Sequence, residues 1–128
     1  MNIGLIGSGG REHALALALT RNPQRDSLFV FGGSANPGIM PLAKKYEVGR
    51  LNDGDAIIRF IQENSVDLVV VGPEAPLMYG LVDRLRALGV LTVGPTKAQA
   101  QLEGNKGFMR DLLQRNVPGA SPEWQVVR

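Results

Sequence analysis

The sequence contains no cysteine and a single histidine, His13, in 128 residues. Without cysteine the chain forms no disulfide and offers no thiolate for catalysis or metal binding. One imidazole argues against a histidine-based metal site or a Ser-His triad within this chain. Any chemistry must therefore rest on backbone groups, carboxylates, amides and guanidinium groups.

A large excess of one charge and long apolar runs are also absent. The formal net charge is only +2, and the densest basic pair is Lys44-Lys45. Such scattered charge argues against a nucleic-acid-binding surface. The apolar stretch at 1–7 is too short for a signal peptide and lacks a basic lead, and no later run could span a bilayer. We therefore expect a cytoplasmic protein that binds neither nucleic acid nor membrane.

The sequence does contain the alternation of short β-rich runs and helical patterns that is typical of a parallel α/β sheet. Its length fits one domain. Strands are expected at 3–6, 28–31, 46–48, 67–71 and 91–93, with a strand-like start at 123–128. Helices are expected at 14–19, from about 53, along a stripe of Leu77, Leu81, Leu85 and Leu88, and from a Thr96-Gln99 capping box to about 115. The pattern predicts an α/β fold with a Rossmann-like open parallel sheet flanked by helices.

Four loops rich in glycine or proline follow the expected strands. Ligands of open parallel sheets bind beyond the carboxyl ends of the strands, so these loops are expected to share one edge. The four are 7–12, 36–38, 72–76 and 94–96.

The first loop suggests an anion site. Its glycines let backbone N–H groups approach a ligand closely, and the following helix start adds unpaired N–H groups. Arg11 adds a fork-shaped cation that suits a phosphate. A tight turn without a ligand remains an alternative. A dinucleotide site is a further one, although Glu12 stands where the third glycine of GxGxxG is expected.

Glu12 and Glu74 are the acids best placed to accept hydrogen bonds from ribose hydroxyls or an amine. Equally, Glu12 fits a helix-start acid and Glu74 a solvated loop acid. Asn36 suits a ligand contact or a turn. The residues alone thus indicate an α/β domain with a phosphate-ester site and leave these roles open.

The run Gly7-Ser8-Gly9-Gly10-Arg11-Glu12-His13-Ala14-Leu15 closely resembles the opening motif of glycinamide ribonucleotide synthetases. Three further stretches match in order: 36–38 (NPG), 71–77 (VGPEAPL) and 94–98 (GPTKA), the last continuing through 101–109. The resemblance covers nearly the whole chain, and GGREHAL with VGPEAPL at this spacing is highly specific. The loop at 32–39 is longer than the family's usual PGNxG, which affects the alignment of Asn36.

The resemblance implies a pre-ATP-grasp domain of a ligase that joins phosphoribosylamine to glycine with ATP and Mg²⁺, through a glycyl phosphate, in de novo purine synthesis. It implies that Gly9, Gly10 and Arg11 hold the 5′-phosphate region. The implied lining of the sugar side is Glu12, Asn36, Gly38 and Glu74, and Gly72 and Pro73 are further implied substrate-binding residues. Lys106 would approach the nucleotide. No catalytic residue or metal ligand is implied in this chain.

The resemblance also implies a missing part, because family members continue for several hundred residues through an ATP-grasp region. We expect residues 1–103 to form the phosphoribosylamine-binding domain and 104–128 to be a linker helix and the start of the ATP-grasp region. Alone, the chain is expected to be inactive, to bind no ATP or Mg²⁺, and to self-associate through an exposed interface. The rival interpretations are an NAD(P)-binding Rossmann module and a non-enzymatic sugar-phosphate sensor.

Overall fold

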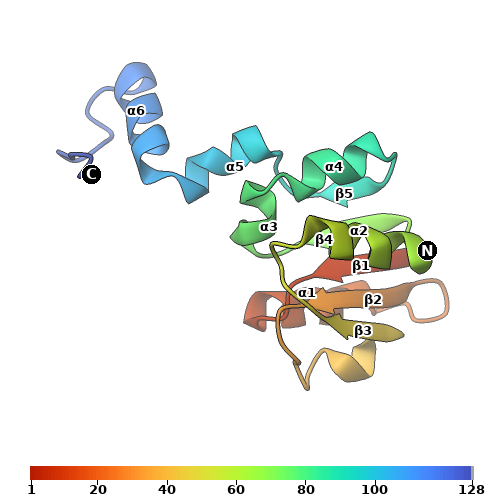
Figure 1. Ribbon diagram of the computed structural model, residues 1–128. Coiled ribbons are helices and arrows are strands. Elements are labelled where there is room, and N and C mark those ends of the chain that lie inside the picture. Colours follow the sequence, from red (N-terminus) through yellow and green to blue (C-terminus); the bar gives the residue numbers. More distant parts are fainter. Residues whose placement is uncertain (128) are drawn as a thin grey trace.

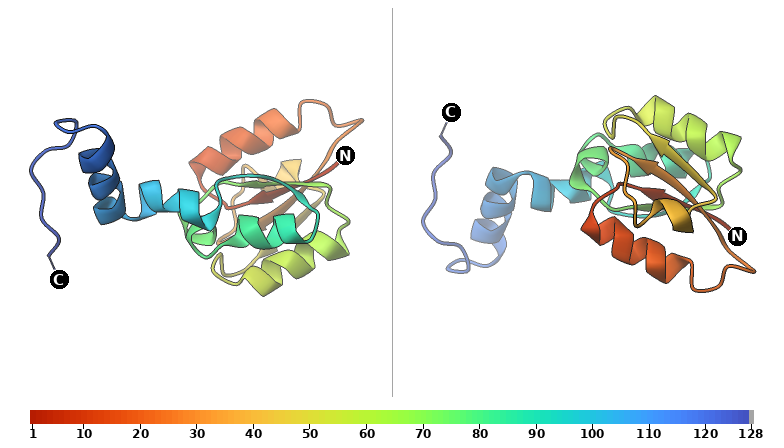
Figure 2. Two further views of the ribbon diagram at one scale, coloured as in Figure 1. Left: turned by 90° about the horizontal axis from the view of Figure 1, so that it is seen from above. Right: turned by 90° about the horizontal axis from the view of Figure 1, so that it is seen from below.

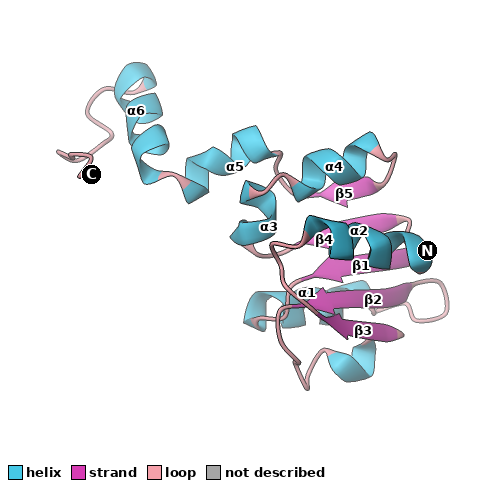
Figure 3. Ribbon diagram, in the orientation of Figure 1, coloured by secondary structure: helices cyan, strands magenta, loops and turns pink. Residues whose placement is uncertain are grey.

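The computed structural model describes residues 1–127 (Figure 1). Five strands alternate with helices along the chain (Figure 3). The strands are β1 (Asn2–Ile6), β2 (Ser27–Gly32), β3 (Lys45–Val48), β4 (Leu68–Val71) and β5 (Leu91–Val93). The helices are α1 (Gly10–Leu19), α2 (Gly54–Glu63), α3 (Glu74–Met78), α4 (Leu81–Ala87), α5 (Lys97–Gly104) and α6 (Lys106–Asn116), with a short 3₁₀ turn η1 (Met40–Leu42).

The strands form one parallel sheet in the order β3-β2-β1-β4-β5. The chain first builds outward from β1 to β3, then returns to add β4 and β5 on the other side of β1. The strand order therefore reverses between β1 and β4. In an open parallel sheet this is where a crevice forms beyond the carboxyl ends of the strands. The predicted fold is confirmed.

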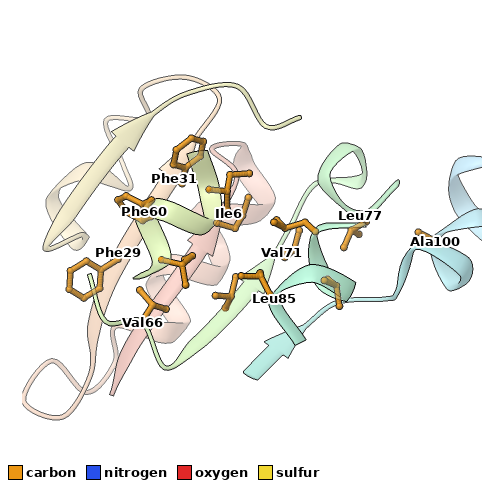
Figure 4. Packing of buried hydrophobic residues seen from close by; sticks show 14 residues of the cluster. Ile6, Phe29, Phe31, Phe60, Val66, Val71, Leu77, Leu85 and Ala100 are labelled. Carbon is orange, nitrogen blue, oxygen red and sulfur yellow. The ribbon is translucent and has the colours of Figure 1, made fainter. Parts of the chain in front are cut away.

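Two apolar cores cover opposite faces of the sheet, because the strands are apolar on both sides. On one face, α2 and α4 enclose the larger core (Figure 4), in which Phe31 and Phe60 pack edge-on with ring centroids 5.7 Å apart. On the other face, α1 and η1 cover β1 and β2 around Leu5, Val30 and Ile39 (Figure 2). The polar loops are thereby left at the two ends of the strands, and the end that follows their carboxyl termini is the edge described below.

The expected helical stripe after Pro76 is wrong in one respect, because it forms two helices. Residue Gly80 adopts a left-handed conformation with φ of 80° and caps the start of α4, which separates α3 from α4. The predicted stripe is buried at Leu77, Leu81 and Leu85. Leu88 lies past the end of α4 and is 52% exposed. The glycine permits a change of direction that an uninterrupted helix excludes.

Beyond β5 the chain forms an arm. The capping box of Thr96 and Gln99 is confirmed at the start of α5. Asn105 ends α5 and caps α6, so the predicted helical region is two helices; α5 packs on α3 and α6 on α5. Residues 123–127 form no strand, contrary to expectation, since no neighbouring strand is there to pair with them; residue 128 lies outside the described residues.

No helix in the described part of the chain is long and apolar enough to cross a membrane.

Candidate functional site at the β1/β4 edge

The loop after β1 turns sharply into α1. Gly7 is buried and has φ of 117°, a backbone conformation that favours glycine. A Cβ on Gly7 would lie 2.8 Å from both Glu12 Cγ and Pro73 Cδ. The position therefore excludes any side chain, and the glycine lets the loops after β1 and β4 come into direct contact.

Glu12 fixes the start of α1. Its side chain is buried, with the residue only 5% exposed, and its Oε2 accepts a hydrogen bond of 2.7 Å from the backbone N–H of Gly9. The rest of the carboxyl group lies against Gly72, where a Cβ would overlap it. The structure thus gives Glu12 the role of a helix-start acid, which was one of its two predicted roles.

Arg11 connects the first helix to the loop after β4. Its Nη1 donates a hydrogen bond of 2.7 Å to the carbonyl oxygen of Gly72, and its Nη2 lies 3.5 Å from Oε1 of Glu74. Both side chains remain about half exposed, 61% and 49% respectively. The guanidinium group therefore lies at the surface of the edge, within reach of a ligand in solution.

Glu74 begins α3, the short helix that follows β4. The pKa of its carboxyl group is lowered, chiefly by a hydrogen bond from its own backbone N–H and then by the positive charge of Arg11. Glu74 is therefore ionised and available as an acceptor at neutral pH.

Asn36 holds the loop after β2 against the loop after β1. Its Nδ2 donates to the carbonyl oxygen of Ser8 at 2.8 Å, and its Oδ1 accepts from the N–H groups of Gly38 and Ile39 at 2.9 and 3.2 Å. Every one of these contacts is to the protein itself. Asn36 therefore behaves as a turn residue that shapes the edge, which was the other role its position suggested.

Ser8, Ser34 and Tyr46, to which the sequence analysis gave no role, and His13 complete this arrangement. Ser8 Oγ lies 3.2 Å from Ser34 Oγ, and the hydroxyl of Tyr46 donates to the carbonyl oxygen of Ser34 at 2.7 Å. The ring of His13 packs against Gly38, where a Cβ would overlap it. The position of Ser8 in the glycine-rich loop was a signal for its contact with Ser34. Nothing near Tyr46 in the sequence indicated the hydrogen bond from Tyr46 to Ser34.

The structure brings nine of the ten predicted site residues to one edge of the sheet, in the loops after β1, β2 and β4 and the first residues of α1 and α3: Gly9, Gly10, Arg11, Glu12, Asn36, Gly38, Gly72, Pro73 and Glu74. Lys106 does not join them. It is the first residue of α6, on the arm (Figure 1), and lines a separate hollow of about 450 Å³ with Arg110 and Trp124.

A second hollow, of about 570 Å³, opens on the same edge as the predicted residues. It lies beyond β2 and β3, and Arg50, Asn52 and Tyr79 are among the side chains that line it. Within residues 1–127, no three side chains of the histidine, aspartate or glutamate type come together to hold a metal ion.

Comparison with known proteins assigns the chain to a family. Residues 1–103 match the model of the phosphoribosylglycinamide synthetase N domain. The phosphoribosylamine–glycine ligase of Brucella melitensis is 51% identical over 119 residues, which is 92% of this chain and 27% of the relative. The ligase of Agrobacterium fabrum is 51% identical over 124 residues, 96% of this chain and 29% of the relative. The chain thus spans little more than a quarter of the length of these curated relatives.

Solved structures show the same fold at low identity. The phosphoribosylglycinamide synthetase from Anaerococcus prevotii has a TM-score of 0.66 at 14% identity, covering 89% of this chain and 28% of that one. An ADP complex of N5-carboxyaminoimidazole synthetase from Staphylococcus aureus has a TM-score of 0.68 at 16% identity, over 89% and 29%. A dTDP-glucose 4,6-dehydratase from Bacillus anthracis, in complex with NAD, has a TM-score of 0.62 at 10% identity, over 92% and 52%.

The fold is therefore shared with NAD enzymes, and the fold alone does not separate them from ligases. The family match over residues 1–103 and the 51% identity to two ligases separate this chain from the NAD enzymes. This chain belongs to the family of the phosphoribosylglycinamide synthetase N domain.

Proposed function

We propose that this chain is the N-terminal, phosphoribosylamine-binding part of a phosphoribosylamine–glycine ligase, which joins phosphoribosylamine to glycine with ATP. The observation that carries the proposal is the meeting of the α1 start, Arg11 and the loop at 72–74 where the strand order reverses. A sugar phosphate suits this place because it combines an anion with hydroxyl groups.

The phosphate region is proposed to lie at the start of α1. Gly9 and Gly10 are exposed, and the first N–H groups of a helix have no partners within it. The N–H of Gly9 is held by Glu12, so the free donors on offer are those that follow it. Arg11 adds charge-assisted donors at the same point.

The sugar side is proposed to lie between the loops after β2 and β4. Glu74 offers an ionised, half-exposed carboxylate for ribose hydroxyls or the amine. Glu12, Asn36, Gly38, Gly72 and Pro73 contribute by shaping the backbone that faces the sugar, since the side chains of Glu12 and Asn36 bond to the protein itself.

The contribution of this domain to the reaction is positioning. Anchoring the phosphate places the ribosyl amine where an activated glycine can meet it, which converts an encounter in solution into a local step. We further propose that residues 1–103 form this domain and that 104–128 lead into the ATP-grasp region. ATP and Mg²⁺ would be bound largely by that region, with Lys106 approaching the nucleotide; Lys106, Arg110 and Trp124 form a cationic hollow that suits a nucleotide phosphate.

The direct test is a backbone NMR titration of the chain with glycinamide ribonucleotide, the stable product, and NAD as comparison ligand. We expect millimolar affinity, about 4 kcal/mol, because the chain supplies only part of the site. Shifts should gather at 9–12, 36–38 and 72–74. Shifts with NAD and none with the ribonucleotide would overturn the proposal.

A pair of arginine variants makes the titration specific. Arg11→Ala is expected to abolish the shifts, whereas Arg21→Ala, which removes an exposed arginine just past the opposite end of α1, should leave them unchanged. Equal loss in both variants would mean that net charge, and not the proposed site, attracts the ligand.

A further inference from the structure

Half of one sheet face is bare. A parallel sheet is normally covered on both faces. Here α2 and α4 lie on one face, and α1 lies on the other at the level of β1 and β2 (Figures 1 and 2). Over β4 and β5, this second face carries no helix within residues 1–127.

The strand register identifies the side chains on the bare half. Leu68 pairs with Ile3 and Val70 with Leu5, so they share the α1 face. Leu91 pairs with Leu68 and Val93 with Val70, which extends this face to the edge strand. We call Leu68, Val70, Leu91 and Val93 the bare patch; Leu91 is 64% exposed and Val93 55% exposed.

Within residues 1–127 the chain does not return to cover the bare patch. After β5, α5 packs on α3, and Ala100 is its buried residue. α6 packs on α5 at the outer end of the arm (Figure 2). The part of the chain that follows the edge strand thus leads away from the sheet, and four apolar side chains stay in contact with water at a cost in free energy.

We propose that the bare patch is the docking surface for an apolar helix face from the part of the longer ligase that this chain does not span. The inference rests on the proposed function, since it assumes that the chain works within such a ligase. The length of the curated relatives leaves room for such an occupant, because this chain accounts for only 27% to 29% of it.

The size of the patch favours a tethered partner over a second copy of this chain. A stable interface between separate proteins takes about 20–30 residues a side. Four side chains fall far below that number. A covalently linked segment needs much less contact, because tethering gives it an effective concentration of about millimolar or higher.

Cysteine labelling tests the proposal cleanly, because the chain has no cysteine of its own. Leu91→Cys and Val93→Cys each place one thiol on the bare patch, and Leu17→Cys places one on α1 at a comparable exposure of 53%. Maleimide labelling is measured peptide by peptide in the isolated chain and in a chimera in which the chain replaces its counterpart in the Brucella melitensis ligase. We expect the chimera to slow labelling at 91 and 93 about tenfold or more, with no change at 17.

Three other outcomes would overturn the inference. Equal labelling rates in both proteins would show that the bare patch stays uncovered. Protection that grows with the concentration of the isolated chain would identify a second copy as the occupant. A chimera that ligates, loses activity with Arg11→Ala and still labels at 91 and 93 would refute the docking surface while leaving the proposed function intact. If positions 91 and 93 are protected in a chimera whose activity is unchanged by Arg11→Ala, the proposed function is refuted and the docking surface is kept.

A charged double variant gives an independent measurement. Leu91→Lys with Val93→Lys should leave the melting temperature of the isolated chain nearly unchanged, because both side chains already face water. In the chimera the same pair should lower the melting temperature, because a helix that docks on this face would bury two unpaired lysine charges. An equal effect in both proteins would contradict the proposal.

Discussion

Replacing Gly72 with alanine is expected to destabilise the protein by about 2–4 kcal/mol. The added Cβ would overlap the Glu12 carboxyl group, coming within 2.7 Å of Cδ and 2.8 Å of Cγ. Two costs contribute: overpacking, at about 1–3 kcal/mol, and weakening of the charge-assisted hydrogen bond to Gly9, worth about 1.5–3 kcal/mol. Movement of the carboxylate relieves the overpacking while it weakens the hydrogen bond, so the total falls below the sum of the two costs.

Urea and thermal unfolding measure this loss. For a domain of this size about 1 kcal/mol corresponds to about 4 °C, which predicts a fall in melting temperature of about 8–16 °C. Gly10→Ala is the matched control at the same edge: nothing lies within 4 Å of its Cβ, and it is the first residue of α1. Alanine there should be neutral or stabilising by up to about 1 kcal/mol.

The decisive comparison is a double-mutant cycle with Glu12→Ala. Removing the Glu12 side chain empties the space that the Cβ at position 72 would occupy, so Gly72→Ala should cost little in that background. If Gly72→Ala is as destabilising without the Glu12 side chain as with it, contact between the two residues is not the cause, and our account of this edge is wrong.

Three further predictions concern other contacts of the edge and the break in the helices. Asn36→Ala should lower the free energy of unfolding by about 1–3 kcal/mol in urea, because it removes three hydrogen bonds; Asn36→Asp, which keeps the acceptor of two of them, should cost less. Arg11→Ala should raise the pKa of Glu74 toward its ordinary value of 4.5 in a carbon-13 NMR titration. The lowered pKa gives a small stabilisation that is present above pH 4.5 and lost as the pH falls through the folded-state pKa; a flat pH dependence of the Arg11 effect would contradict this. Gly80→Ala should cost about 1 kcal/mol or more by thermal unfolding, with Gly80→Asn less harmful, because position 80 has φ of 80°.

The inner strands β1, β2 and β4 were predictable because each appears in the sequence as a nearly continuous apolar run, as expected of strands inside a parallel sheet. Residues 68–71 are all leucine or valine, and the structure places β4 there. The third strand lies on the edge of the sheet and is mixed in character, with Lys45 and Glu47 among its four residues, yet its expected position held. The common edge of the loops then followed from parallel topology alone.

The helix boundaries after β4 were not predictable in the same way. A leucine every four residues fits one long helix as well as two short ones, so the pattern did not show the break at Gly80. A glycine in a helical pattern has many explanations. Its left-handed conformation depends on where α3 and α4 must pack, which is a property of the tertiary structure.

The contacts that assemble the edge were also beyond the sequence. Asn36 bonds to Ser8, 28 residues away, and Tyr46 reaches Ser34 from β3. Such contacts form between residues that come together only when the sheet has folded. Sequence reasoning could name the residue types that suit a ligand, but it could not tell which of them the protein already uses for itself.

Glu12 shows why this distinction matters for function. In a dinucleotide fold a third glycine at this point lets the helix start lie close to a pyrophosphate. Here a buried carboxylate stands in its place and already takes the N–H of Gly9. A second negative charge, from a pyrophosphate lying across this loop, would meet that carboxylate at close range. A single phosphate covers less of this loop, and Arg11 offers it charge-assisted donors. The buried Glu12 carboxylate therefore argues against a pyrophosphate lying across this loop, although the fold itself is shared with an NAD enzyme.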